Sequence, residues 1–473
     1  MDFGIFTFDF TLLLDFFSRP TLPILVDIFS LGGYLFVVWL LLYAGLHFYE
    51  EYRQELNVHH WKWIVLAVDM PALNVQTPKA VEQMFSHLAG ALDTANIAEK
   101  FYHGHKQRWF SFEIISIGGY IQFLIRTEEH FRDLVEASVY AQYPEAEIIE
   151  VEDYVNSIDY HFPNDQVDMW GADFILANND AYPIRTYREF EHSISKDTVL
   201  KDPMGAFLES FSRIGPGEQM WFQMLIEPVG NHWKEKAIDK IKEIIGDTSH
   251  GHGHGGSPIL DKVSSAPLKL LEGIGDQVFA REAGEHGDSH DKAGPKNEIQ
   301  YLTPGQKLTV EAMEAKISKI GFKTKIRALY IANKEVFRPS RGVNALIGAI
   351  SQYNIPTANS IVPGYGVGAH YFFKNYVINH KKNLLMKAYK KRKLKAGSNP
   401  YILNIEELAT IWHFPMSHVK TPLVQKAIGK QAEPPAGLPV EQFLPPPPPK
   451  PKNHGLGSGT DAGGEYPQGI TFG

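Results

Sequence analysis

"FSFEIISI" (110–117), Gly118-Gly119 and "YIQFLIR" (120–126) decide the fold of this chain. β-branched and aromatic residues fill both segments, a composition typical of strands. The two glycines between them form a two-residue connection, and glycine tolerates the positive φ that a tight hairpin turn requires. The stretch therefore predicts an antiparallel β-hairpin.

The segments on both sides of the hairpin predict the rest of an α+β unit. "WKWIVLAV" (61–68) is typical of a buried strand, and "AEIIEV" (146–151) of a closing strand. Two helices separate these strands from the hairpin, and apolar residues recur in them at helical spacing: Val81, Met84, Phe85 and Leu88 after Pro78, then Phe131, Leu134, Val135 and Val139. The order β-α-β-β-α-β predicts a ferredoxin-like domain over residues 60–156.

A second α+β domain is expected over residues 170–352, as a partial repeat of the first. Its predicted elements are strands at 173–178, 218–229 and 323–332, and helices at 204–214 and 309–320, the latter with Val310, Met313, Ile317 and Ile320 inward. One strand of the repeat is not evident. Residues 246–298 are rich in Gly, Ser, His and Asp and predict a flexible insertion. Residues 431–473, with five consecutive prolines, predict a disordered tail.

The N-terminal region predicts a membrane anchor over residues 1–56. "IFSLGGYLFVVWLLLYAGL" (28–46) is a run of 19 residues without a charge, enough to cross about 30 Å of hydrocarbon as a transmembrane helix. Arg53 and Lys62 follow the run, and only Arg19 precedes it. This bias favours a single-pass protein of the cytoplasmic membrane with its soluble part in the cytoplasm.

A basic segment, "NHKKNLLMKAYKKRKLKAG" (379–397), is the main candidate for binding a partner, within a basic helical segment and connector over 353–430. It belongs to a stretch without carboxylates (336–405) that carries +11, which leaves −19 to the rest of the chain because the net charge is −8. Such asymmetry indicates nucleic acid, anionic lipid, or an acidic surface on the same or another protein. The candidate residues are Lys374, Lys381, Lys382, Lys387, Lys390, Lys391, Arg392, Lys393 and Lys395. Leu384, Leu385 and Tyr389 fall near one helical face.

Motifs for catalysis and for cofactors are missing. The chain has no cysteine and no G-x-x-x-x-G-K-[S/T] phosphate loop, and "GYGVG" (364–368) predicts a plain loop. Carboxylates cluster near one predicted strand and predict a solvated edge rather than a catalytic pair: Glu145, Glu147, Glu150, Glu152 and Asp153. A weak metal site is conceivable at "HGHGH", with His250, His252 and His254, but glycine spacers leave it unorganised. We expect no cofactor and no enzyme activity.

Long collinear segments resemble a known family. They are "SFEIISIGGYIQFLIRTEEHFRDLVEASVYAQYPEAEIIEVEDY" (111–154), "VEAMEAKISKIGFKTKIRALYIANKEVF" (310–337), "KAYKKRK" (387–393), "LNIEELATIWHFP" (403–415) and "EPPAGLP" (433–439). The region resembles the membrane-anchored N-terminal domain of unknown function found ahead of the motor in type IV secretion or conjugation-like ATPases of small-genome bacteria. The phosphate loop of that motor is absent here. The resemblance therefore implies either that the motor is a separate polypeptide, which would be an ATPase partner, or that the chain is a truncated or specialised stand-alone form.

These observations together predict a membrane-anchored, non-enzymatic accessory or docking module of a type IV secretion or conjugation-like system. The alternative is a membrane-tethered protein that binds nucleic acid on its own. Lysine contacts phosphate as a point charge, so such binding would show no sequence preference. The expected partners are the membrane, the ATPase or another complex subunit, DNA under the alternative, and a second copy of the chain.

Overall fold

The computed structural model describes residues 2–3, 6–7, 29, 33–71, 74–157, 160–192, 199–200, 202–245, 302–368 and 373–417. The predicted insertion (246–298) and tail (431–473) lie outside these residues. The structure confirms the α+β class, because helices pack on an antiparallel sheet of nine strands.

The sheet runs in the order β12-β7-β11-β10-β4-β5-β3-β6, and β13 pairs with β11. Its strands are β3 (Trp63–Asp69), β4 (Phe110–Ile117), β5 (Tyr120–Glu128), β6 (Glu147–Val151), β7 (Val167–Leu176), β10 (Glu218–Pro228), β11 (Gly321–Asn333), β12 (Ile361–Gly366) and β13 (Tyr401–Asn404). Two separate short pairs are β1 (Asp2–Phe3) with β2 (Phe6–Thr7), and β8 (Glu191–His192) with β9 (Val199–Leu200).

The predicted hairpin is present as β4 and β5. Ile117 pairs with Tyr120 across the turn, and Gly118 and Gly119 have φ of 60° and 95°. Both glycines therefore occupy the left-handed region that the two-residue turn demands.

Each half of the sheet has the same strand order. The first half runs β6-β3-β5-β4 and the second β12-β7-β11-β10, so each has its fourth strand at the outside, followed by its first, third and second. The halves join where β4 pairs with β10, antiparallel. The strand that the sequence did not reveal is β12, which includes part of the glycine-rich stretch 364–368 predicted to be a loop.

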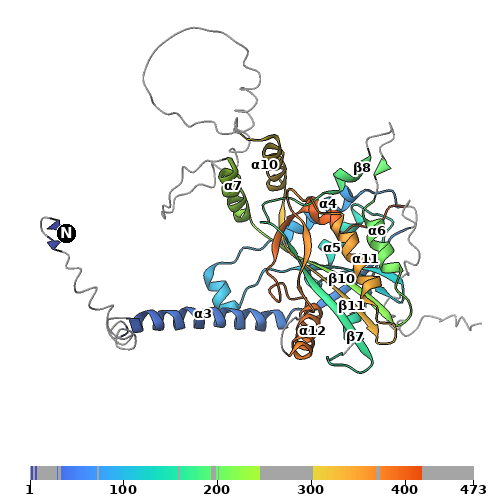
Figure 1. Ribbon diagram of the computed structural model, residues 1–473, viewed down its shortest axis with the longest axis horizontal. Helices are drawn as coiled ribbons and strands as arrows, with labels where there is room; N and C mark the ends of the chain where they lie inside the picture. Colours follow the sequence, from blue (N-terminus) through green and yellow to red (C-terminus); the bar gives the residue numbers. More distant parts are fainter. Residues whose placement is uncertain are drawn as a thin grey trace, which may run out of the picture. The chain divides into compact units, whose positions relative to one another are not determined.

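The α-helices among the described residues lie on the two faces of this sheet or beside it. They are α3 (Tyr34–His59), α4 (Pro78–Leu88), α5 (Arg132–Tyr140), α6 (Met204–Ser212), α7 (His232–Ile245), α10 (Pro304–Ile317), α11 (Pro339–Ser351), α12 (Lys374–Lys390) and α13 (Ile405–Ile411). Helices α4, α5, α6, α11 and α13 pack on one face, around the largest hydrophobic core. Helix α12 packs on the other face through a second core, and Figure 1 draws it apart from α4, α5, α6 and α11.

Two expectations about helices need correction. The helix predicted at 309–320 is α10, which packs with α7 in a satellite cluster instead of covering the sheet. Ile320 follows its end and is 38% exposed, because the helix stops at Ile317. In the second half, α11 occupies the position between the third and fourth strands that the prediction left open.

Candidate functional site: a buried polar row beneath the basic segment

A row of polar side chains crosses the sheet on the face that α12 covers. Glu113 on β4 is registered with Gln223 on β10, Gln223 with Arg327 on β11, and Arg327 with Asp173 on β7. All four side chains have a relative exposure of 0%. Burying such groups is costly unless each one has a partner.

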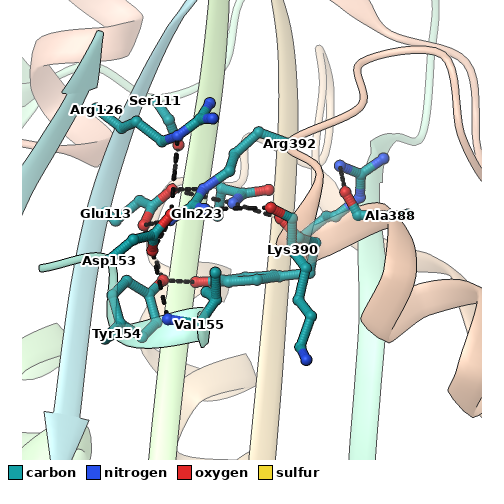
Figure 2. A network of polar contacts seen from close by, with 12 residues as sticks. Ser111, Glu113, Arg126, Asp153, Tyr154, Val155, Gln223, Ala388, Lys390 and Arg392 are labelled. Atoms are coloured by element: carbon teal, nitrogen blue, oxygen red, sulfur yellow. Dashed lines mark hydrogen bonds and ion pairs between the residues drawn. The ribbon is translucent and has the colours of Figure 1, made fainter. Parts of the chain in front are cut away.

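Arg392 pairs with Glu113 and Asp153 in a double fork, drawn in Figure 2. Its Nε lies 2.9 Å from Glu113 Oε1 and its Nη2 lies 3.1 Å from Oε2. Its Nη1 and Nη2 also donate to Asp153, at 2.6 and 2.9 Å. Bidentate contacts between guanidinium and carboxylate are among the strongest hydrogen bonds in proteins.

Neutral groups satisfy the remaining lone pairs of Glu113. Ser111 Oγ and Gln223 Nε2 donate to Oε1 at 2.5 and 3.1 Å, and Tyr154 Oη donates to Oε2 at 2.8 Å. Burial by itself would raise the pKa of Glu113, but the Arg392 guanidinium and these donors lower it from 4.5 to about 2. Glu113 is therefore held as a buried carboxylate.

The backbone of Arg392 shows how firmly this contact is built. Arg392 has φ of 47°, in the left-handed region. Its N–H donates to the Tyr389 carbonyl, and the N–H of Lys393 donates to the Ala388 carbonyl, at 3.0 and 3.1 Å. These two bonds form a Schellman motif at the end of α12, in which the residue with positive φ is usually glycine. An arginine here is strained, and its ion pairs offset that strain.

The other end of the row holds the chain after α12. Asp173 pairs with Arg327 at 2.8 Å and with Lys325 at 3.1 Å. Arg327 Nη2 donates to the carbonyls of Lys393 and Ala396, at 2.5 and 2.6 Å. Every one of these contacts involves buried charge or a backbone carbonyl, so they fix the path of the segment closely.

Gly397 allows this approach to Asp173. It has φ of 83°, and a Cβ built on it would lie 2.0 Å from Asp173 Oδ2. The next residue, Ser398, donates its N–H to the same oxygen at 2.9 Å. The polar row therefore holds residues 388–398 from both ends, and this arrangement is suited to fixing a segment in place.

The structure divides the nine predicted binding residues into groups. Arg392 is buried and Lys382 is nearly so, paired with Asp168. Lys393 pairs with Glu55 and Lys395 with Glu51, both on α3, at 3.1 and 3.7 Å. Lys381 donates to the Gly368 carbonyl at 2.8 Å, and Lys390 also has an interaction within the chain. The remaining three are exposed: Lys374, Lys387 and Lys391.

Part of the acidic surface expected for the basic segment thus belongs to the same chain. Arg392, although predicted as a binding residue, faces the interior because the left-handed turn directs it toward Glu113. Leu384 was expected on the same helical face as Leu385 and Tyr389, but it is 45% exposed, whereas those two residues are buried.

The other candidate clusters add no site. His250, His252 and His254 lie outside the described residues, and no group of His, Cys, Asp or Glu within the described ranges could hold a metal ion. Of the predicted acidic cluster, Asp153 pairs with Arg392 and Glu150 pairs with Arg132 at 2.9 Å. The cluster is therefore partly neutralised by arginines.

Helix α3 differs from the other helices because it buries none of its residues. Its C-terminal half contacts the sheet domain: Arg53 donates to the Tyr102 carbonyl and Asn57 to the Gly104 carbonyl. The expected transmembrane span over 28–46 is not found among the described residues, where no helix is both long and apolar enough to cross a membrane. Residues 28 and 30–32 of that span lie outside the described residues.

Sequence reasoning missed the polar row, although a signal was present. Glu113 interrupts the apolar run "FSFEIISI", and Arg327 interrupts "KIRALYI". A charged residue in the middle of an otherwise apolar strand indicates a buried ion pair.

A family model matches most of the chain. Residues 50–427 match the family model described as a domain of unknown function, DUF8128. No curated protein matches the chain.

Proposed function

The chain belongs to the DUF8128 family, and we propose that it is a membrane-attached docking module, without enzyme activity, of a type IV secretion or conjugation-like system. The observation that carries this proposal is the apolar N-terminal half of α3. The finer fold assignment is part of the proposal: we infer that each half of the sheet is a ferredoxin-like unit, because each repeats the order of its fourth, first, third and second strands.

The N-terminal half of α3 exposes large apolar side chains on all sides. Every large hydrophobic residue of this half is at least 41% exposed: Tyr34, Leu35, Phe36, Val37, Val38, Trp39, Leu40, Leu41, Leu42, Tyr43 and Leu46. A helix that is apolar all round is stable only when protein or lipid covers it. Residues 34–46 extend over about 20 Å, which suits insertion into lipid at less than full bilayer depth.

The docking part of the proposal is supported by the way the basic segment is held. A rigid sheet domain fixes residues 388–398 through the polar row, and this leaves the outside of α12 as a presented surface. Internal carboxylates already pair with Lys382, Arg392, Lys393 and Lys395. This loss of free charge weakens the alternative of a nucleic-acid binder, since affinity for DNA depends on the number of phosphates neutralised.

Two parts of the proposal, the ATPase partner and the translocation system, rest on the family resemblance. We expect the full chain, purified in mild detergent, to capture a motor ATPase that carries its own phosphate loop. Capture would be identified by mass spectrometry. Recovery of subunits from an unrelated complex, and of no ATPase, would contradict this part of the proposal.

Membrane attachment is tested by flotation of the full chain with phosphatidylcholine vesicles. Leu41→Asp places a charge in the apolar half of α3, at a cost of about 3 kcal/mol in the membrane, and should reduce binding on the order of a hundredfold. Leu308→Asp on α10 is the matched control, because Leu41 and Leu308 are both 66% exposed. Equal flotation of the two variants would refute the proposal.

A further inference from the structure

The outer face of α12 carries aromatic and basic side chains at helical spacing. Tyr376, His380, Leu384, Lys387 and Lys391 form this face at steps of three and four residues, and Phe373 and Lys374 extend it at the N-terminal end of the helix; all seven are exposed. Residues three and four positions apart share one side of a helix. The opposite side of α12 packs on the sheet through Leu385, Met386 and Tyr389. The helix is therefore fixed with this outer face directed away from the sheet.

The charge on the outer face is largely without counterions among the described residues. Lys374, Lys387 and Lys391 form no ion pair there, in contrast to Lys382 on the inner side, which pairs with Asp168. Lys391 has a longer-range electrostatic interaction with Glu55, and Glu55 itself pairs with Lys393. The sequence from 336 to 405 supplies no carboxylate that could pair with them locally. The face is thus complementary to an anionic partner.

The exposed aromatic side chains indicate which class of anionic partner fits this face. Phe373 is 83% exposed and Tyr376 is 75% exposed, and the Tyr376 ring stacks on His380 at 6.3 Å between centroids. A partner held purely by electrostatic attraction, such as duplex DNA, offers no apolar environment for an exposed phenylalanine. Aromatic rings beside lysines are typical of helices that lie in the interface of a membrane.

The position of the segment relative to α3 agrees with a membrane surface. Lys393 and Lys395, just beyond the outer face, pair with Glu55 and Glu51 on α3. Glu51 follows Leu46, the end of the apolar half of α3, by about 8 Å along the helix. The headgroup layer extends about 5–8 Å beyond the hydrocarbon on each side, so inserting α3 along its axis brings Lys395, the partner of Glu51, to headgroup level. Lys393 pairs with Glu55, about 6 Å farther along the helix, and lies just outside that layer.

We propose that the outer face of α12 binds an anionic phospholipid surface beside the lipid-inserted half of α3. This inference rests on the proposed membrane attachment and adds a lipid class to it. Lys374, Lys387 and Lys391 attract the headgroups, while Phe373 and Tyr376 enter the interface between headgroups and acyl chains.

The test compares binding of the full chain to vesicles of phosphatidylcholine alone and of phosphatidylcholine mixed with phosphatidylserine. A lysine near an anionic surface strengthens binding about fivefold. We therefore expect anionic vesicles to bind more tightly, on the order of a hundredfold at low salt. The variant Lys374→Gln/Lys387→Gln/Lys391→Gln should abolish that difference and leave binding to neutral vesicles unchanged.

A control variant with the same change of charge is Lys79→Gln/Lys236→Gln/Lys307→Gln, at exposed lysines on other helices. It should keep the preference for anionic vesicles. If the two triple variants behave alike, or if neutral and anionic vesicles bind equally, the inference is wrong. Loss of duplex DNA binding in the outer-face variant, with the lipid preference intact, would overturn it in favour of nucleic acid.

The membrane attachment of α3 and the lipid binding by the outer face of α12 can be refuted separately. Binding to neutral vesicles, and its loss in Leu41→Asp, reports only on α3. In the Leu41→Asp background, residual binding to anionic vesicles that depends on the three lysines would support the outer face of α12 alone. Absence of that residual binding would count against the outer face, whatever the result for α3.

Discussion

Replacing Arg392 by methionine should destabilise the protein by about 3 kcal/mol at neutral pH. The change keeps much of the volume of the side chain but leaves Glu113, which has 0% exposure, without its cation. Removal of one member of a buried ion pair costs about 3–5 kcal/mol in general, because the other charge remains buried and unpaired.

The pKa of Glu113 gives a stabilisation of the same order. In the intact protein, Arg392, with help from Ser111 and Tyr154, outweighs the effect of burial and lowers that pKa from 4.5 to about 2, which corresponds to about 3 kcal/mol. A carboxyl group whose pKa is lowered in the folded state stabilises the fold at a pH above its pKa in the unfolded chain. This contribution is lost as the pH falls from about 4.5 to about 2. In the variant, burial instead raises the pKa of Glu113. The stability difference between the two proteins should therefore shrink toward zero in acid.

Urea unfolding of the detergent-solubilised full chain, followed by tryptophan fluorescence, measures both effects. Trp221 is a suitable reporter because it is buried and its ring centroid lies 5.0 Å from that of Tyr154. The matched control is Arg213→Met, since Arg213 forms an exposed pair with Glu209 that contributes about 0.5 kcal/mol or less. The reasoning is refuted if both variants unfold alike at pH 7, or if the difference does not shrink in acid.

We expect three further outcomes. Glu113→Gln added to Arg392→Met should restore about 1–3 kcal/mol of unfolding free energy, because it removes the unpaired charge; a further loss in urea unfolding would contradict this. Gly397→Ala should cost about 2–4 kcal/mol, through the contact with Asp173 and the positive φ, whereas Gly348→Ala, with open space in α11, should be neutral or stabilising. Calorimetry should detect no micromolar ATP binding, since the phosphate loop is missing, and stoichiometric binding would disprove that expectation.

Local elements of the fold could be predicted from the sequence because their signals are local. Val81, Met84, Phe85 and Leu88 recur at helical spacing, and all four are 0% exposed on the inner side of α4. The hairpin of β4 and β5 follows from two strands and a pair of glycines. In both cases a few neighbouring residues contain all the information that the element needs.

Elements with weak local signals were missed. β12 contains Pro363, Gly364 and Gly366, which resemble loop residues. Such a strand is tolerated because β12 lies at the edge of the sheet and pairs only with β7 among the described strands. Its place is set by tertiary pairing, and sequence periodicity does not report tertiary pairing.

The polar row could not be assembled from the sequence, since its partners are far apart in the chain. Glu113 and Arg392 are separated by 279 residues, and no local sequence pattern around either residue identifies the other as its partner. Charge counting also groups Arg392 with its lysine neighbours. Only the left-handed turn after α12 separates it from them, and arginine is not a residue that predicts such a turn.

The long separation between Glu113 and Arg392 has a consequence for synthesis. A ribosome adding about 5–20 residues per second needs roughly 15–60 s to pass from one residue to the other. During that interval the face carrying Glu113 lacks helix α12 and the Arg392 guanidinium, although Tyr154 and Val155 have already been synthesised. The interval is longer still for Asn74, which donates a hydrogen bond to the Pro415 carbonyl, 341 residues later in the chain. The first half of the sheet therefore gains its last contacts only after residues 392–415 have left the ribosome, and we expect the nascent chain to need protection from aggregation until then.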